Sequence, residues 1–101
     1  MAVVSPITLA ECLVLPYKQK SLGVAEVFTD LLVNSESVLF HPIDEVTADK
    51  AADLRARYNL TLTDALQLAV AIQAECDAFL TNDIDLKRVT EIPIIVLSEV
   101  E

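Results

Sequence analysis

Three acidic residues, Glu11, Asp64 and Asp83, occupy positions from which they could do chemistry together. Asp64 falls in the first turn of an expected apolar helix, and Asp83 comes directly after an expected apolar strand. A helix that leads into a strand of a parallel sheet can bring both carboxylates to one edge of that sheet, where ligands usually bind. Carboxylate oxygens are the ligands that Mg²⁺ and Mn²⁺ prefer. The pattern therefore predicts a site for a divalent cation.

Each of these acids also has an explanation that involves no ligand. Thr8 and Glu11 have the spacing of a capping box, in which the acid satisfies backbone donors at the start of a helix. Thr61 and Asp64 have the same spacing, and Asp83 fits an ordinary turn. Three carboxylates at one edge, however, would repel one another and raise their pKa values unless a cation lay between them. The residues alone leave both explanations open.

Apolar strands alternate with amphipathic helices along the chain. Ser5 is the expected N-cap of the first helix, and Pro6 suits its first turn. Asp44 and Glu45 suit the start of the third helix, because acidic side chains stabilise the positive end of the helix dipole. The expected strands are residues 3–4, 37–40, 78–81 and 92–97; the expected helices are residues 7–18, 22–33, 44–58 and 63–75, with a helical turn at 84–89. This alternation predicts an α/β fold with a parallel sheet flanked by helices.

The composition fits a single domain over residues 1–101. The chain is 53% hydrophobic with a mean hydropathy of +0.48, which is enough to build a core. No apolar run is long enough to span a membrane, and the N-terminus lacks the features of a signal peptide. Cys12 and Cys76 have no metal-ligand spacing, so we expect reduced thiols. These features predict a cytoplasmic protein that makes no membrane contact.

The net charge of −9 restricts the classes of partner. Broad electrostatic binding of nucleic acid needs a basic surface, which this composition does not offer. An enzyme that meets phosphate groups through bound cations is still compatible, because such ions invert the local charge. A basic protein partner is compatible as well.

Three segments carry a resemblance to a known family: residues 5–11 (SPITLAE), 62–69 (LTDALQLA) and 79–83 (FLTND). In this order and spacing they resemble the successive motifs of PIN-domain ribonucleases, and most closely those of VapC-type toxins from prokaryotic toxin–antitoxin pairs. The resemblance runs essentially from residue 3 to residue 97. It implies a metal-dependent endoribonuclease that hydrolyses RNA phosphodiesters with metal-activated water.

The same resemblance implies roles for individual residues. Three acids would be both catalytic residues and metal ligands, with one further acid as an auxiliary ligand and two polar residues placed to contact the RNA substrate. The three catalytic acids and metal ligands are Glu11, Asp64 and Asp83. The auxiliary ligand is Asp85, and the two residues that would contact the RNA are Thr81 and Asn82. The implied cofactor is Mg²⁺ or Mn²⁺.

One departure from the family pattern concerns the start of the chain. The family opens with a strand that ends in Asp-x-Asn, followed by one or two helices, whereas no acidic residue precedes Glu11 here. The resemblance therefore implies a PIN-like domain that lacks its first strand, its first helix and its first core acid, and it implies weak metal binding.

The missing strand also implies consequences for assembly. The strands at residues 3–4 and 78–80 would lose their shared neighbour, so they should pair directly or be covered by another chain. We expect a homodimer or higher oligomer, with the helices at residues 7–18 or 22–33 in the contact. The alternative function is a non-catalytic remnant that acts as a protein-interaction module, with an antitoxin protein as its partner.

Overall fold

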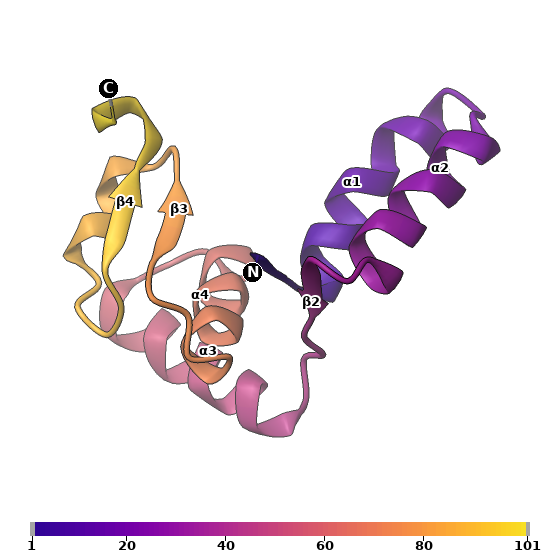
Figure 1. Ribbon diagram of the computed structural model, residues 1–101. Helices are drawn as coiled ribbons and strands as arrows, with labels where there is room; N and C mark the ends of the chain where they lie inside the picture. Colours follow the sequence, from indigo (N-terminus) through magenta and orange to yellow (C-terminus); the bar gives the residue numbers. More distant parts are fainter. Residues whose placement is uncertain (1, 101) are drawn as a thin grey trace. The chain divides into compact units, whose positions relative to one another are not determined.

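The computed structural model describes residues 2–100 of the chain. The chain divides into two compact units, which we call unit 1 (up to Asp44) and unit 2 (from Glu45 onward). Each unit combines helices with one pair of short parallel strands (Figure 1). The expected mixed α/β class with parallel strands is confirmed.

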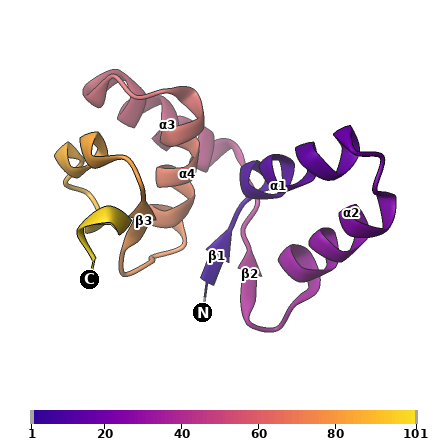
Figure 2. The same cartoon turned by 90° about the horizontal axis from the view of Figure 1, so that it is seen from above.

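Unit 1 is a helical hairpin connected at both ends to a pair of strands. Its elements are β1 (Ala2–Val4), α1 (Pro6–Lys18), α2 (Leu22–Thr29), the π-helical turn η1 (Asp30–Asn34) and β2 (Val38–Phe40). Strand β1 pairs with β2 in parallel, with Val3 opposite Leu39. Figure 2 shows the two strands side by side, with α1 and α2 running next to each other beyond them.

The start of α1 follows the expected capping chemistry, with a different partner for Ser5. Ser5 is fully buried, and its Oγ accepts the backbone N–H of Ile7 at 3.1 Å. In return, the hydroxyl oxygen of Thr8 accepts the Ser5 N–H at 3.3 Å. The capping box therefore joins Ser5 and Thr8, and the predicted box between Thr8 and Glu11 is wrong. The reason is positional: Thr8 already lies inside the helix, three residues beyond the true N-cap.

The second helix has the expected extent but changes its winding. It is α-helical as far as Thr29 and continues as a π-helical turn from Asp30 to Asn34. The hydroxyl of Thr29 donates to the carbonyl oxygen of Ala25 at 3.0 Å, at the position where the backbone ladder would place its own bond. The amide of Asn34 donates to the Asp30 carboxylate at 2.9 Å across the wider turn.

Unit 2 holds a compact hydrophobic core. Its elements are α3 (Glu45–Tyr58), α4 (Leu62–Gln73), β3 (Phe79–Thr81), the 3₁₀ turn η2 (Ile84–Arg88), β4 (Ile94–Val96) and the 3₁₀ turn η3 (Leu97–Glu99). Helices α3 and α4 pack against each other, and β3 pairs with β4 in parallel. The central buried side chains are Ala51, Leu54, Leu60, Ala65, Leu68, Ala69, Leu86 and Ile92.

Two expected elements of unit 2 are shorter than predicted. Helix α4 ends at Gln73, because Glu75 adopts a left-handed φ of 57° and Cys76 returns its N–H to the Ala71 carbonyl at 3.0 Å. Strand β4 begins only at Ile94, since Pro93 has no backbone donor for a ladder.

The described strands form two separate two-stranded sheets, one in each unit. The two expected outcomes for the strands at residues 3–4 and 78–80, direct pairing or cover by another chain, stay predictions. None of the described helices has the length and apolar character needed to cross a bilayer.

Candidate functional site

Asp64 lies in the first turn of α4, where the sequence places it. Thr61 is the N-cap, and its Oγ1 accepts the Asp64 N–H at 3.1 Å. This bond fixes the backbone at the start of the helix, and the positive end of the helix dipole favours the carboxylate there. Asp64 is half-buried. Thr61 is thus confirmed as the cap of α4. The capping bond uses the backbone N–H of Asp64, so the helix dipole, and not this bond, influences the Asp64 carboxylate.

Asp83 organises the turn that follows β3. The Asp83 N–H is accepted by Thr81 Oγ1 at 3.0 Å, and Asp83 Oδ1 accepts the Asp85 N–H at 2.9 Å. Asp83 is therefore the N-cap of η2. Together with Asn82, these residues form one continuous turn that presents two exposed carboxylates. The turn explanation is confirmed, and it places four of the six predicted site residues together.

Arg88 connects this turn to the end of α3. One guanidinium nitrogen donates to the Asp85 carbonyl at 3.0 Å, and another donates to the Tyr58 carbonyl. The side chain therefore positions the segment that carries Asp83 and Asp85. No local sequence pattern predicts that Arg88 positions this turn, because one of its acceptors is a backbone oxygen 30 residues away.

A second set of contacts ties the loop before β4 to α3. Arg57 forms a bidentate contact with Asp53, at 3.0 and 3.1 Å, and also contacts the Glu91 carboxylate. Partial burial opposes the ionisation of Glu91. Hydrogen bonds from Tyr58 and Arg57, with the positive charge of Arg57, outweigh this effect and lower the pKa of Glu91 to about 2. Glu91 is thus ionised whenever the fold is intact near neutral pH.

The predicted acids are divided between the two units. Glu11 lies on α1 of unit 1, whereas Asp64, Asp83 and Asp85 belong to unit 2. Among residues 2–100, no three side chains of His, Cys, Asp or Glu come together in a group that could hold a metal ion. The donor chemistry of these acids suits a hard cation, since every donor is a carboxylate oxygen. The carboxylates that the described residues bring together are too few to complete a metal site by themselves.

Comparisons with known proteins identify the family. The PIN domain family model matches residues 1–92, a span that includes every acid discussed above. No curated protein and no solved structure matches the chain. PIN domains typically use divalent metals, and they generally bind RNA. The chain belongs to the PIN domain family, whose members are generally nucleases.

Proposed function

We propose that the chain is a PIN-like, metal-dependent ribonuclease of the VapC type, a cytoplasmic toxin of a toxin–antitoxin pair, with residues 1–101 acting as one domain. The observation that supports this proposal best is the turn after β3. There, hydrogen bonds hold Asp83 and Asp85 in place within a chain that matches the PIN family over residues 1–92.

The roles proposed for the acids follow from the resemblance of their motifs to those of PIN-domain ribonucleases. Glu11, Asp64 and Asp83 would hold Mg²⁺ or Mn²⁺, with Asp85 as an auxiliary ligand. The bound ion would supply a polarised water for in-line attack on an RNA phosphodiester and would neutralise the charge that develops there. Weak binding of the ion is expected, because few carboxylates are available to replace the water ligands that Mg²⁺ gives up reluctantly.

The polar residues of the turn would orient the RNA. Thr81 Oγ1 accepts the Asp83 N–H, so its hydroxyl hydrogen can still be donated to a phosphate oxygen. Asn82 is exposed next to it and carries two amide donors. Both groups would fix the substrate beside Asp83 without a full positive charge.

The test is cleavage of single-stranded RNA in Mn²⁺ by the wild type and by Asp64→Asn and Asp83→Asn. Asparagine keeps an oxygen that can accept the Asp85 N–H, so the turn should survive while the charge is lost. Each variant should lose about 10²-fold or more in rate, as when a catalytic acid is removed. Asp49→Asn, which removes an exposed charge from α3, is the control. Unchanged activity in both variants would contradict the catalytic assignment.

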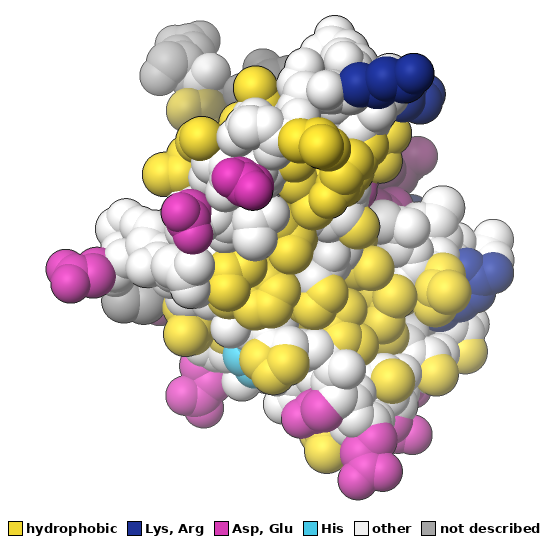
Figure 3. Space-filling view, turned by 90° about the vertical axis from the view of Figure 1, so that its right-hand side faces the viewer, with side chains coloured by type: hydrophobic (Ala, Val, Ile, Leu, Met, Phe, Trp, Pro, Cys, Tyr) yellow, Lys and Arg dark blue, Asp and Glu magenta, His cyan; other side chains and the backbone are white. Residues whose placement is uncertain are grey.

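A second candidate function is favoured by the exposure of unit 1. Among residues 2–44, only Ser5, Pro16 and Ala25 are buried. Figure 3 views the side of α1 and α2, where hydrophobic side chains cover much of the visible surface. The exposed apolar side chains of these helices include Val14, Leu15, Tyr17, Leu22, Val24, Val27 and Leu31. Apolar surface of this extent is typical of an interaction site.

We therefore propose association through unit 1, as a homodimer or higher oligomer and with an antitoxin protein. Light scattering at micromolar concentration should show a mass above that of one chain. Leu15→Lys and Leu31→Lys should shift the protein toward the monomer, whereas Val46→Lys, at a residue of α3 that is 58% exposed, should not. A wild-type protein that is monomeric throughout would refute self-association.

A further inference from the structure

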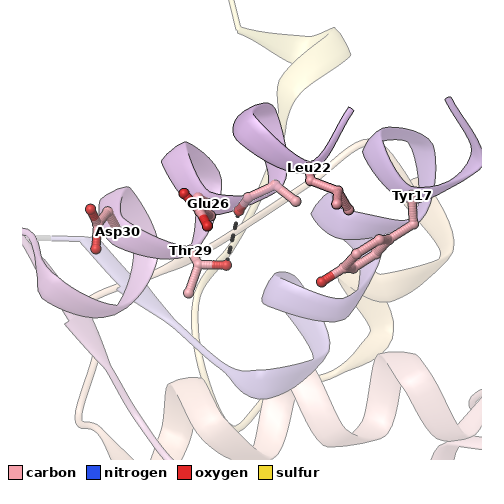
Figure 4. Close-up of a pocket in the computed structure, with 6 residues that line it drawn as sticks. Tyr17, Leu22, Glu26, Thr29 and Asp30 are labelled. Atoms are coloured by element: carbon pink, nitrogen blue, oxygen red, sulfur yellow. Dashed lines mark hydrogen bonds between the residues drawn. The ribbon is translucent and has the colours of Figure 1, made fainter. Parts of the chain in front are cut away.

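A pocket lies on unit 1 between the end of α1 and one face of α2. Its volume is about 510 Å³. Tyr17 contributes one wall, and the other lining residues are Leu22, Ala25, Glu26, Thr29 and Asp30 (Figure 4). These five residues, four from α2 and Asp30 from the start of η1, recur at intervals of three and four, so they form a single stripe along the helix.

The polar groups of this pocket are predominantly hydrogen-bond acceptors. The Thr29 hydroxyl donates its hydrogen to the Ala25 carbonyl at 3.0 Å, which leaves its oxygen as an acceptor. Glu26 and Asp30 add two carboxylates one helical turn apart. Like charges at this spacing destabilise a helix, so a cation beside both would relieve the repulsion. None of the ion pairs within residues 2–100 involves either carboxylate.

The apolar part of the pocket completes a site for a long cationic side chain. Figure 4 shows Tyr17 extending from α1 toward the stripe on α2, with Leu22 beside it. An aromatic face attracts a guanidinium group, and Leu22 can cover the methylene stem of the same side chain. Arginine suits this arrangement better than lysine, because its planar fork can donate to two carboxylates at once.

The surroundings of the pocket indicate the kind of molecule that would carry this side chain. Exposed apolar residues of α2 and η1, including Val27 and Leu31, flank the acidic stripe. The whole chain carries a net charge of −9, which attracts basic partners. We propose that this pocket receives an arginine side chain from a basic, amphipathic segment of a partner protein. The proposal rests on the association role of unit 1 and is independent of nuclease activity.

The probe for this proposal is N-acetyl-arginine amide, titrated into the isotope-labelled protein and followed by nuclear magnetic resonance. Chemical shifts should move at Tyr17, Leu22 and Thr29, with a dissociation constant in the millimolar range expected of a single side chain. The citrulline analogue has nearly the same shape and no charge, and it should bind at least about tenfold more weakly, since charged hydrogen bonds are the stronger kind.

Matched double variants separate the pocket from the general charge of the protein. Glu26→Gln with Asp30→Asn should weaken binding of the arginine probe by about tenfold. Glu36→Gln with Asp49→Asn removes the same charge from two exposed residues outside the pocket and should leave binding unchanged. Equal binding of arginine and citrulline would overturn the proposal, and so would equal losses in the two double variants.

Light scattering on the same variants distinguishes this proposal from self-association. If Glu26→Gln with Asp30→Asn changed the oligomeric state, the occupant would be a cationic side chain of a second copy, and the proposal of a foreign partner would fail. A monomeric wild type that still bound the arginine probe would refute self-association and leave the pocket assignment intact. Nuclease activity should be the same in both double variants.

Discussion

Tyr58, the last residue of α3, donates its hydroxyl hydrogen to the carboxylate of Glu91 at 2.6 Å. The bond joins a helix terminus to the loop before β4, across 33 positions of sequence. Arg88, the last residue of η2, donates to the carbonyl oxygen of the same tyrosine, so Tyr58 anchors both the end of η2 and the loop that follows it. The C-terminal end of the turn that carries Asp83 and Asp85 is therefore held against α3 by two contacts.

The ionised form of Glu91 should stabilise unit 2 in a pH-dependent way. Its pKa falls from the ordinary 4.5 to about 2 on folding, so its contribution is complete above about pH 4.5 and is lost as the pH falls toward 2. At pH 6, Glu91→Gln should lower the free energy of unfolding by about 1–2 kcal/mol. Urea unfolding at a series of pH values should show this difference shrinking below pH 4.5.

Replacement of Tyr58, which donates a hydrogen bond to Glu91, tests the origin of the lowered pKa of Glu91. Tyr58→Phe should move the acid loss of stability to higher pH, because Glu91 loses a hydrogen bond that favours its ionised form. Tyr17→Phe, at an exposed tyrosine of α1, is the matched control. An unchanged acid profile in Tyr58→Phe would show that Arg57 alone sets the ionisation of Glu91.

The two helices of the unit 1 hairpin should respond differently to loss of their N-cap serines. The Ser5 side chain caps α1 with two backbone hydrogen bonds, whereas the Ser21 side chain makes no capping bond to α2. Ser5→Ala should therefore destabilise α1 by about 1 kcal/mol, and Ser21→Ala should have a much smaller effect. Hydrogen exchange of the α1 and α2 amides measures both, and equal effects would contradict the capping assignment.

The core of unit 2 should be sensitive to the loss of side-chain volume. Leu68 is fully buried on α4, so Leu68→Ala should reduce the free energy of unfolding by about 2–5 kcal/mol. Leu62, on the same helix, is 55% exposed, and Leu62→Ala should change it by less than about 0.5 kcal/mol. Urea unfolding followed by circular dichroism compares the two. Similar losses would mean that unit 2 does not unfold around this core.

The two cysteines should differ in reactivity. Cys12 is exposed on α1, whereas partial burial, with the charge of Asp77, raises the pKa of the Cys76 thiol. Since the thiolate is the reactive species, iodoacetamide at pH 8 should modify Cys12 first. Mass spectrometry of peptides at successive times gives the order, and faster labelling of Cys76 would contradict the burial of its thiol.

Magnesium should bind this chain weakly. Few carboxylates are proposed as ligands to replace the water that Mg²⁺ gives up reluctantly, so calorimetry should show millimolar rather than micromolar affinity. Asp83→Asn should weaken the binding further, and Asp49→Asn should leave it unchanged. Micromolar affinity in the wild type would show that the site is complete.

Local chemistry made parts of this structure predictable. Ser5 and Pro6 predict the start of α1, and Thr61 predicts the start of α4, because capping depends on residues within three positions of each other. The short strands were recognised from their apolar runs. The box assigned to Thr8 and Glu11 failed because two overlapping capping patterns compete for one helix start, and spacing alone does not rank them.

The remaining features depend on long-range contacts. The pocket beside Glu26 and Asp30 exists only because Tyr17 approaches from the other helix of the hairpin. The role of Arg88 depends on a carbonyl oxygen at the end of α3. The pairing of β1 with β2 and of β3 with β4 likewise depends on contacts between segments that are distant in the sequence. No local pattern predicts such contacts.

Unit 1 has far fewer buried side chains than unit 2, so its folding should depend on whether a partner molecule is bound to it. The buried hydrophobic cluster lies entirely within residues 51–92, so unit 1 draws little stability from its own interior. Any molecule that covers α1 and α2 adds its binding free energy to the stability of that unit by mass action. The concentration of the partner would then set how often unit 1 opens, and with it the fraction of time that Glu11 is held on an intact helix.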